Sequence, residues 1–205
     1  MFRATQVVVL AAFCAAAPAV ASVTVFDSRA AFRAWGEMMP QVRVARENFS
    51  AVSQGFTPGA LAGMPASETS WQASAIGGLT GAGGMLHTLE AGRSMVIEFQ
   101  SSQVRGVGAD FFYSNGLGEA VAGYVVLALA DGTQFVRNVH GMDSFAGFWS
   151  DGAAISRITI TPIGPAGAAN VLGADDMDIG YVPVPTPGAL ALVLIAAMTG
   201  RRRGR

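Results

Sequence analysis

Between residues 44 and 182 the chain alternates short runs of apolar and polar positions, the pattern of half-buried β-strands. The clearest runs cover 95–99, 109–114, 125–129 and 158–161. Turn pairs separate the later runs at Asn115-Gly116, Asp131-Gly132 and Asp151-Gly152, and each pair tolerates the positive φ of a tight hairpin. This order predicts a mainly β domain, an antiparallel two-sheet β-sandwich with a jelly-roll, lectin-like form as the preferred version.

One segment has helical spacing instead. Ser28 can cap a helix that runs to Met38, and Phe32 and Trp35 are expected to pack against the sheet. The stretch 54–84 is rich in Gly, Ala, Ser and Pro, which predicts long loops around one strand near 71–76. We find no repeat of fixed length and no linker to a second domain.

The N-terminus has the order of a secretory signal peptide. Arg3 precedes an apolar run, 7–17, and the small residues Ala19 and Ala21 suit signal peptidase. Cleavage after Ala21 makes Ser22 the first residue of the mature chain. The single cysteine, Cys14, lies in the removed segment, so the mature domain is expected to have no disulfide or thiolate site.

The C-terminus also has an apolar segment next to arginines, but here the arginines follow the apolar segment. A proline-rich stretch is followed by an apolar segment, 189–199, and by four arginines within 201–205. As a helix the apolar segment covers about 20 Å, whereas a hydrocarbon core is about 30 Å thick. It is therefore a poor permanent anchor, and the arginines are expected to stay on the cytoplasmic side. An unprocessed membrane anchor is the alternative.

This tail resembles the PEP-CTERM sorting signal of Gram-negative bacteria. The motif residues are Val184, Pro185, Thr186 and Pro187, and Thr186 stands where the family usually has glutamate. The resemblance implies that the chain attaches transiently to the inner membrane, is cut by an exosortase, and reaches the cell surface or extracellular matrix. The expected parts are a signal peptide, 1–21, a β-sandwich domain, 22–182, and a sorting tail, 183–205.

Short blocks of the middle region also look like those of PEP-CTERM exported proteins. They include Glu47-Asn48-Phe49, Asp110 with its neighbours, and Phe148-Trp149-Ser150-Asp151. The resemblance implies a lectin-like or carbohydrate-module-like sandwich and supplies no substrate.

The charge balance argues against nucleic-acid binding. Eight arginines and fourteen acidic residues lie between Ser22 and Val182, a net charge of −6, and the chain has no lysine. An acidic surface repels phosphate backbones.

Enzyme motifs are scarce, so we expect a non-enzymatic protein. His87 and His140 are the only histidines, and no serine has a Gly-x-Ser-x-Gly frame. Paired carboxylates leave one alternative, a secreted carbohydrate-active hydrolase. The carboxylates that are conceivable partners are Glu47, Glu98, Asp110 and Asp175.

Three carboxylates fall within four residues at Asp175, Asp176 and Asp178, and they repel one another unless a cation or arginines offset them. Calcium accepts such oxygen ligands. Similarity to jelly-roll carbohydrate modules implies that Glu47 and Asn48 meet Asp175 or Asp176 around a structural calcium. A solvated acidic strand end is the alternative.

Aromatic side chains are the candidates for stacking on a sugar, with burial in the core as the alternative. The candidates are Trp71, Phe148 and Trp149. The sequence therefore predicts an exported surface or matrix protein that binds extracellular polysaccharide. The hydrolase and a purely structural surface protein stay open as alternatives.

Overall fold

The computed structural model describes residues 22–50, 55–57, 60–63 and 69–183. The predicted signal peptide and residues 184–205 of the predicted sorting tail, with the predicted processing residues Ala19, Ala21 and Val184 to Pro187, lie outside these residues. Within the described part of the chain, no helix is long and apolar enough to cross a membrane.

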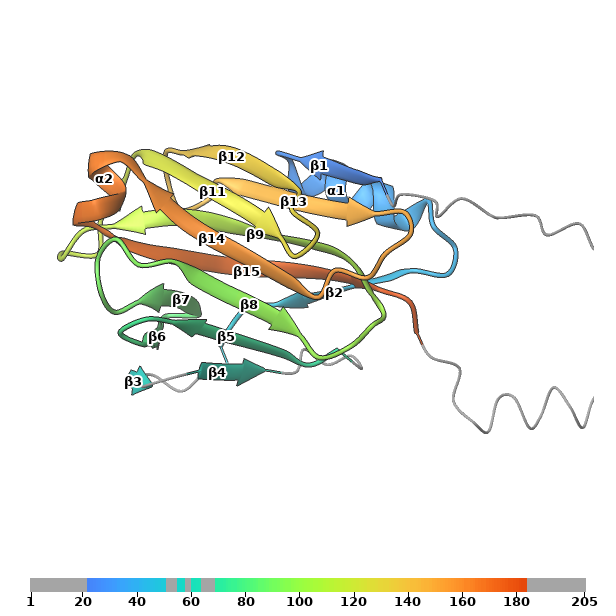
Figure 1. The fold of residues 1–205 in the computed structure, drawn as a ribbon, viewed down its shortest axis with the longest axis horizontal. Coiled ribbons are helices and arrows are strands. Elements are labelled where there is room, and N and C mark those ends of the chain that lie inside the picture. The colour runs from blue at the N-terminus through green and yellow to red at the C-terminus, as the bar shows by residue number, and fades with distance from the viewer. Residues whose placement is uncertain (1–21, 51–54, 58–59, 64–68, 184–205) are drawn as a thin grey trace, which may run out of the picture.

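Two antiparallel sheets pack face to face (Figure 1). Among the described residues, the larger sheet has the order β1 (Val23–Phe26), β13 (Phe145–Ser150), β9 (Val104–Ser114), β15 (Val171–Tyr181), β7 (Met85–Thr88), β6 (Leu79–Ala82) and β3 (Gly55–Thr57). β10 (Ala120–Val121) also pairs with β9, and β2 (Arg43–Glu47) with β15. The smaller sheet has the order β12 (Gln134–Val139), β11 (Gly123–Leu129), β14 (Arg157–Ile163), β8 (Met95–Phe99), β5 (Trp71–Ala75) and β4 (Ala60–Gly63). The predicted antiparallel two-sheet sandwich is confirmed.

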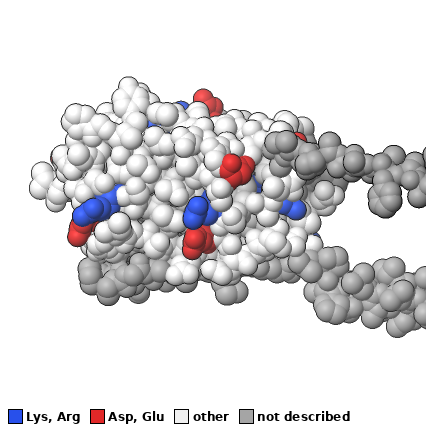
Figure 2. Space-filling view, viewed as in Figure 1, with Lys and Arg blue, Asp and Glu red and all other residues white. Residues whose placement is uncertain are grey.

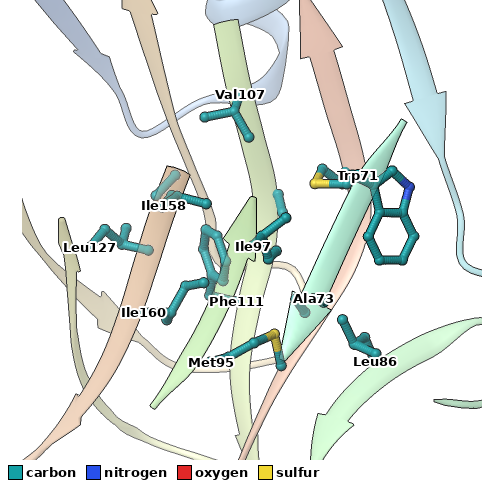
Figure 3. Close-up of a cluster of buried hydrophobic side chains, with 14 of the residues drawn as sticks. Trp71, Ala73, Leu86, Met95, Ile97, Val107, Phe111, Leu127, Ile158 and Ile160 are labelled. Atoms are coloured by element: carbon teal, nitrogen blue, oxygen red, sulfur yellow. The ribbon is translucent and has the colours of Figure 1, made fainter. Parts of the chain in front are cut away.

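The core lies between the two sheets and is built from the alternating positions of their strands (Figure 3). On β9, Val107 and Phe111 point inward and are 1% exposed, and Ile158 and Ile160 of β14 face them and are fully buried. Burying each of these side chains stabilises the folded state by about 1.5–3 kcal/mol relative to leaving it exposed to water. On the larger sheet the opposite face also buries apolar side chains, because Phe145 and Trp149 of β13 form a second cluster there with Phe32.

Helix α1 (Arg29–Glu37) covers part of the outer face of the larger sheet. Ser28 caps it by accepting a bond from the amide of Ala31, as predicted. Phe32 is fully buried, but Trp35 remains 36% exposed, which corrects the expectation that both residues are buried. The helix follows β1 directly, so its position depends on that edge strand.

Trp149 of β13 fills the space between α1 and the sheet. Its Nε1 donates to the carbonyl of Phe32 at 2.9 Å. Glycines opposite the ring make this approach feasible, since a Cβ on Gly180 would lie 2.0 Å from it and one on Gly106 2.7 Å. The ring thereby joins the helix to β9, β13 and β15.

The structure corrects two other sequence expectations. The described residues within 54–84 form four strands, β3, β4, β5 and β6, instead of one strand in long loops, because pairing with other strands orders these short segments. The turns after β9 and β11 are hairpins as predicted. Asp151-Gly152 is not a hairpin, because β13 and β14 belong to different sheets. The short helix α2 (Gly164–Ala169) was not predicted.

Candidate functional site

A bulge in β15 arranges the acidic run on the outer face of the larger sheet. Asp175 lies opposite Asp110 of β9, and the register then shifts before Asp178. Asp176 adopts φ 49°, a left-handed conformation that aspartate tolerates better than most residues. Met177 points into the core, and Asp178 reaches the same outer side as Asp110.

Two arginines of α1 form ion pairs with the carboxylates of Asp110 and Asp178. Arg29 donates to Asp178 Oδ2 at 2.6 Å, to the carbonyl of Asp176 at 2.6 Å and to Asp110 Oδ2 at 2.7 Å. Arg33 donates two hydrogen bonds to Asp178, from Nε to Oδ2 at 3.0 Å and from Nη2 to Oδ1 at 2.6 Å. Asp178 is fully buried, and among the described residues these two guanidinium groups are its ion-pair partners. We name this cluster of Arg29, Arg33, Asp110 and Asp178 the arginine–aspartate network.

The rest of the acidic run is less completely neutralised. Arg46 of β2 donates to both carboxylate oxygens of Asp176, and this hydrogen bonding raises the pKa of Arg46. Burial raises the pKa of Asp175, although its carboxylate accepts a bond from the Asp176 amide at 2.6 Å. Burial also raises the pKa of Asp110, and the bond from Arg29 opposes this effect. Two neighbouring carboxylates are thus easier to protonate than usual.

The residues predicted to meet around calcium have other partners. Glu47 is buried and accepts bonds from the amide of Phe49 at 2.8 Å and from Trp71 Nε1 at 3.1 Å. The Asn48 side chain accepts two bonds from Ser50. The described residues contain no group of three or more His, Cys, Asp or Glu side chains arranged to hold a metal ion. In this structure arginines balance the acidic run, and Glu47 and Asn48 take no part in it.

The three aromatic candidates are core residues. Trp71 and Trp149 are 1% exposed and Phe148 is fully buried, so none presents a ring face on which a sugar can stack. The prediction of sugar stacking by these residues is therefore corrected. Its physical reason is that large rings gain most by filling the sandwich interior and the space under α1.

The other candidate chemistries are placed as follows. Asp110 and Asp175 are direct cross-strand neighbours, whereas Glu98 lies on the other sheet opposite Arg157. Arg29 occupies one oxygen of Asp110. Ser144 Oγ accepts a bond from the backbone amide of His140 and donates to a carbonyl, so it bonds to the backbone of that histidine. His87 packs against Phe112, and burial lowers its pKa.

A groove between α1 and β2 has a volume of about 610 Å³. We name it the α1–β2 groove. Its lining residues are Arg33, Gly36, Glu37, Val42, Arg43, Val44, Arg46 and Asp178. Half of the eight arginines between residues 22 and 182 lie on these two elements, at positions 29, 33, 43 and 46. Sequence reasoning missed this site, although the Arg29/Arg33 helical spacing and the Arg43/Arg46 pair were a signal for it.

The arginines of this groove are held in place unequally. Asp178 and Asp176 engage Nε and Nη2 of Arg33 and Arg46, and the Nη1 groups of both make no hydrogen bond within the described residues. Arg43 is exposed and forms no ion pair with a described residue. Two guanidinium groups are thus oriented in advance, and a third has all its donors available in this part of the structure.

The outer face of the smaller sheet has a different character. Tyr124 of β11 is 51% exposed, Val136 of β12 is 55% exposed, and Thr159 and Thr161 of β14 lie alongside. Figure 2 shows few charged side chains on this face, over the strands labelled β8, β11 and β14 in Figure 1. No described segment covers this face, and it is mostly uncharged.

Comparison with known proteins yields no family. No family model matches the chain, and no curated protein matches it. Among solved structures, it is similar to a variant of a family 29 carbohydrate-binding module complexed with mannohexaose, with a TM-score of 0.39 and 12% identity over 68% of this chain and 90% of that one. A second structure of a family 29 carbohydrate-binding module gives a TM-score of 0.38 and 12% identity over 67% and 89% of the two chains. At these values the similarity assigns neither a family nor a ligand.

Proposed function

We propose that residues 22–182 form an exported, non-catalytic binding domain whose α1–β2 groove takes a segment of an acidic polysaccharide. The observation that carries the proposal is the groove itself, with Arg33, Arg43 and Arg46 at its wall. Ligand pockets usually measure about 300–1,000 Å³, so this groove fits a short sugar segment. The planar guanidinium group of Arg43 can donate to both oxygens of a carboxylate, and Arg33 and Arg46 can each add a bond from Nη1, which points to uronic-acid-type sugars.

The fixed arginines favour binding energetically. A free arginine side chain has rotamer entropy equivalent to about 2 kcal/mol, and part of it is lost when the side chain binds a ligand. Asp178 and Asp176 have already fixed Arg33 and Arg46, so the ligand meets donors that are oriented before it arrives. Because the domain as a whole is acidic, the attraction is local, and it should weaken as salt is added.

The expected cellular location supports the same proposal. The signal peptide pattern and the resemblance of the tail to a sorting signal both predict delivery to the cell surface or extracellular matrix. Extracellular polysaccharide is abundant there, and the arrangement needs no cofactor. Signal peptidase and an exosortase-type enzyme are the processing partners in this proposal, and contact with the inner membrane is transient.

Calorimetric titration of the exported protein tests the groove. Oligomers of a uronic acid should bind, neutral glucose oligomers of equal length should not, and affinity should fall with salt. Arg43→Gln should reduce affinity at least about tenfold, a loss of about 1.4 kcal/mol. Arg43 is suited to this test because its removal breaks no ion pair among the described residues.

The matched control is Arg93→Gln, which removes an exposed arginine paired only with Glu90 among the described residues. An equal loss of affinity in both variants would show a general charge effect and refute the proposal that the groove binds the ligand. The absence of binding to any uronic-acid oligomer at millimolar concentration would refute it as well.

The exposed Tyr124 favours a second candidate, a neutral polysaccharide on the outer face of the smaller sheet. An exposed aromatic ring among hydroxyl groups can stack on a sugar and hydrogen-bond to it. In that case neutral oligomers bind, Tyr124→Ala abolishes binding, and Arg43→Gln does not. For the hydrolase alternative, new reducing ends that disappear in Asp110→Asn or Asp175→Asn would replace the non-catalytic proposal.

A further inference from the structure

The start of β1 is joined to the end of β13 by a small set of hydrogen bonds. The backbone nitrogen of Ser22 donates to Asp151 Oδ1 at 2.7 Å, and its hydroxyl donates to Oδ2 at 2.7 Å. In return, the Asp151 amide donates to the carbonyl of Ser22 at 3.1 Å. These bonds lie one residue beyond the last ladder pair, Val23 with Ser150, so they close the ladder of an edge strand.

Ser22 is also the residue that the signal peptide pattern places first after cleavage. In an uncut chain its nitrogen is an amide with one N–H and no charge. Hydrolysis of the Ala21–Ser22 bond adds one water molecule, leaves a carboxylate on Ala21, and frees an α-amine on Ser22. Such an amine has an ordinary pKa of about 7.7–8.0 and is mostly protonated at neutral pH.

We propose that cleavage between Ala21 and Ser22 converts this hydrogen bond into an ion pair between the Ser22 ammonium group and the Asp151 carboxylate, which fastens β1 to β13. The inference rests on the export step of the proposed function and is independent of the ligand. The hydroxyl of Ser22 holds the second carboxylate oxygen, so the carboxylate is already oriented toward the nitrogen. Cleavage therefore adds a positive charge to a hydrogen bond between Ser22 and Asp151 that the fold already positions.

The pair has consequences for the rest of the domain. Among the described strands β1 pairs only with β13, and it leads directly into α1. The helix in turn supplies Arg29 and Arg33 to the arginine–aspartate network. An anchored β1 therefore limits fraying of the edge next to that network.

In the part of the chain that the structure describes, few other charges lie on the elements next to this end of β1. β13 carries no charged residue. On α1, Arg29 and Arg33 are paired with aspartates and Glu37 lines the groove. Asp131, in the turn after β11, lines a small pocket together with Val23 and Ser150, and its carboxylate accepts a bond from the amide of Thr133. Asp131→Asn is therefore a matched control that removes an equal charge at the same end.

The absence of lysine makes the test selective, because the mature protein then has a single primary amine. The full chain is expressed in an exporting Gram-negative host, and the N-terminus of the exported form is sequenced; Ser22 is expected first. Reductive methylation with ¹³C-formaldehyde then labels that amine, and its pKa is followed by NMR. We expect the amine pKa to lie at least about 0.5 pH unit higher in the wild type than in Asp151→Asn. Asp131→Asn should leave most of this difference in place.

Acetylation of the same amine gives a second measurement. It removes the charge, and it should lower the melting temperature of the wild type but not of Asp151→Asn. An N-terminus at another residue, or equal amine pKa values in the wild type and Asp151→Asn, overturns the inference. Both results leave glycan binding untouched, whereas failure of the chain to be exported contradicts the proposed function itself.

Discussion

Replacing Arg29 with methionine removes the centre of the arginine–aspartate network while keeping most of the apolar stem. Of their ion-pair partners among the described residues, Asp178, which is fully buried, then keeps Arg33, and Asp110 keeps none. Breaking a buried ion pair by removing one partner costs about 3–5 kcal/mol. The Arg29 and Asp110 side chains are 20% and 15% exposed, so solvent screens part of this cost and we expect a loss of about 3 kcal/mol.

The loss should depend on pH in a defined direction. The bond from Arg29 now opposes the effect of burial on Asp110, so its removal raises the pKa of Asp110 further. The folded variant then binds a proton more readily than the unfolded chain, whose aspartate has a pKa of about 3.9. As the pH falls from 7 through the raised pKa toward that value, the deficit should shrink.

Urea denaturation of the purified protein at pH 7 and pH 4.5 measures both effects. Arg93→Met is the matched control, because it breaks an exposed pair and should cost no more than about 0.5 kcal/mol. Adding Asp110→Asn to the Arg29 variant should recover part of the stability at pH 7. A loss below about 1 kcal/mol, or a deficit that grows on acidification, would refute the account of the network.

Three other predictions concern the scaffold. The Glu47 carboxylate accepts hydrogen bonds from the indole N–H of Trp71 and the amide N–H of Phe49, and Glu47→Ala leaves both donors without this partner. The substitution should lower the free energy of unfolding by about 2–4 kcal/mol in urea denaturation. Gly180→Ala forces a Cβ against Trp149 and should cost at least about 2 kcal/mol, whereas Gly116→Ala, with open space around it, should cost little; similar losses would contradict this packing. Asp175→Asn should stabilise the protein at pH 7, because burial raises the pKa of that carboxyl, and the gain should vanish as the pH falls to about 4. A gain that persists at pH 4 would exclude the charge as its cause.

The sequence predicted those features that depend on neighbours along the chain. The alternation at 95–99 and 158–161 identified strands because one face of each is buried, and the Ser28 cap defined where α1 begins. Asp131-Gly132 formed the expected hairpin because its strands are adjacent in the sheet. The same reasoning failed at Asp151-Gly152, where the chain crosses to the other sheet.

The candidate site was only partly visible in the sequence. The acidic run was recognised, and arginines were named as one means of balancing it. Which arginines do so depends on α1 lying across β9 and β15, since Arg29 and Asp178 are 149 positions apart. The aromatic candidates show the same limit, because composition cannot tell whether a ring such as Trp149 lies outside the sheet or under a helix.

The sequence by itself determined the β-rich fold class, the capped helix and the absence of lysine and cysteine from residues 22–182, and it supplied the prediction that both ends are sorting segments. These follow from composition and from patterns within a few residues. Only the tertiary structure decided the bulge at Asp176, the pairing of Ser22 with Asp151 and the groove between α1 and β2. The physical reason is that strand register and helix placement are set by packing between distant segments, and hydrogen bonds and ion pairs form only once that packing has brought their partners together.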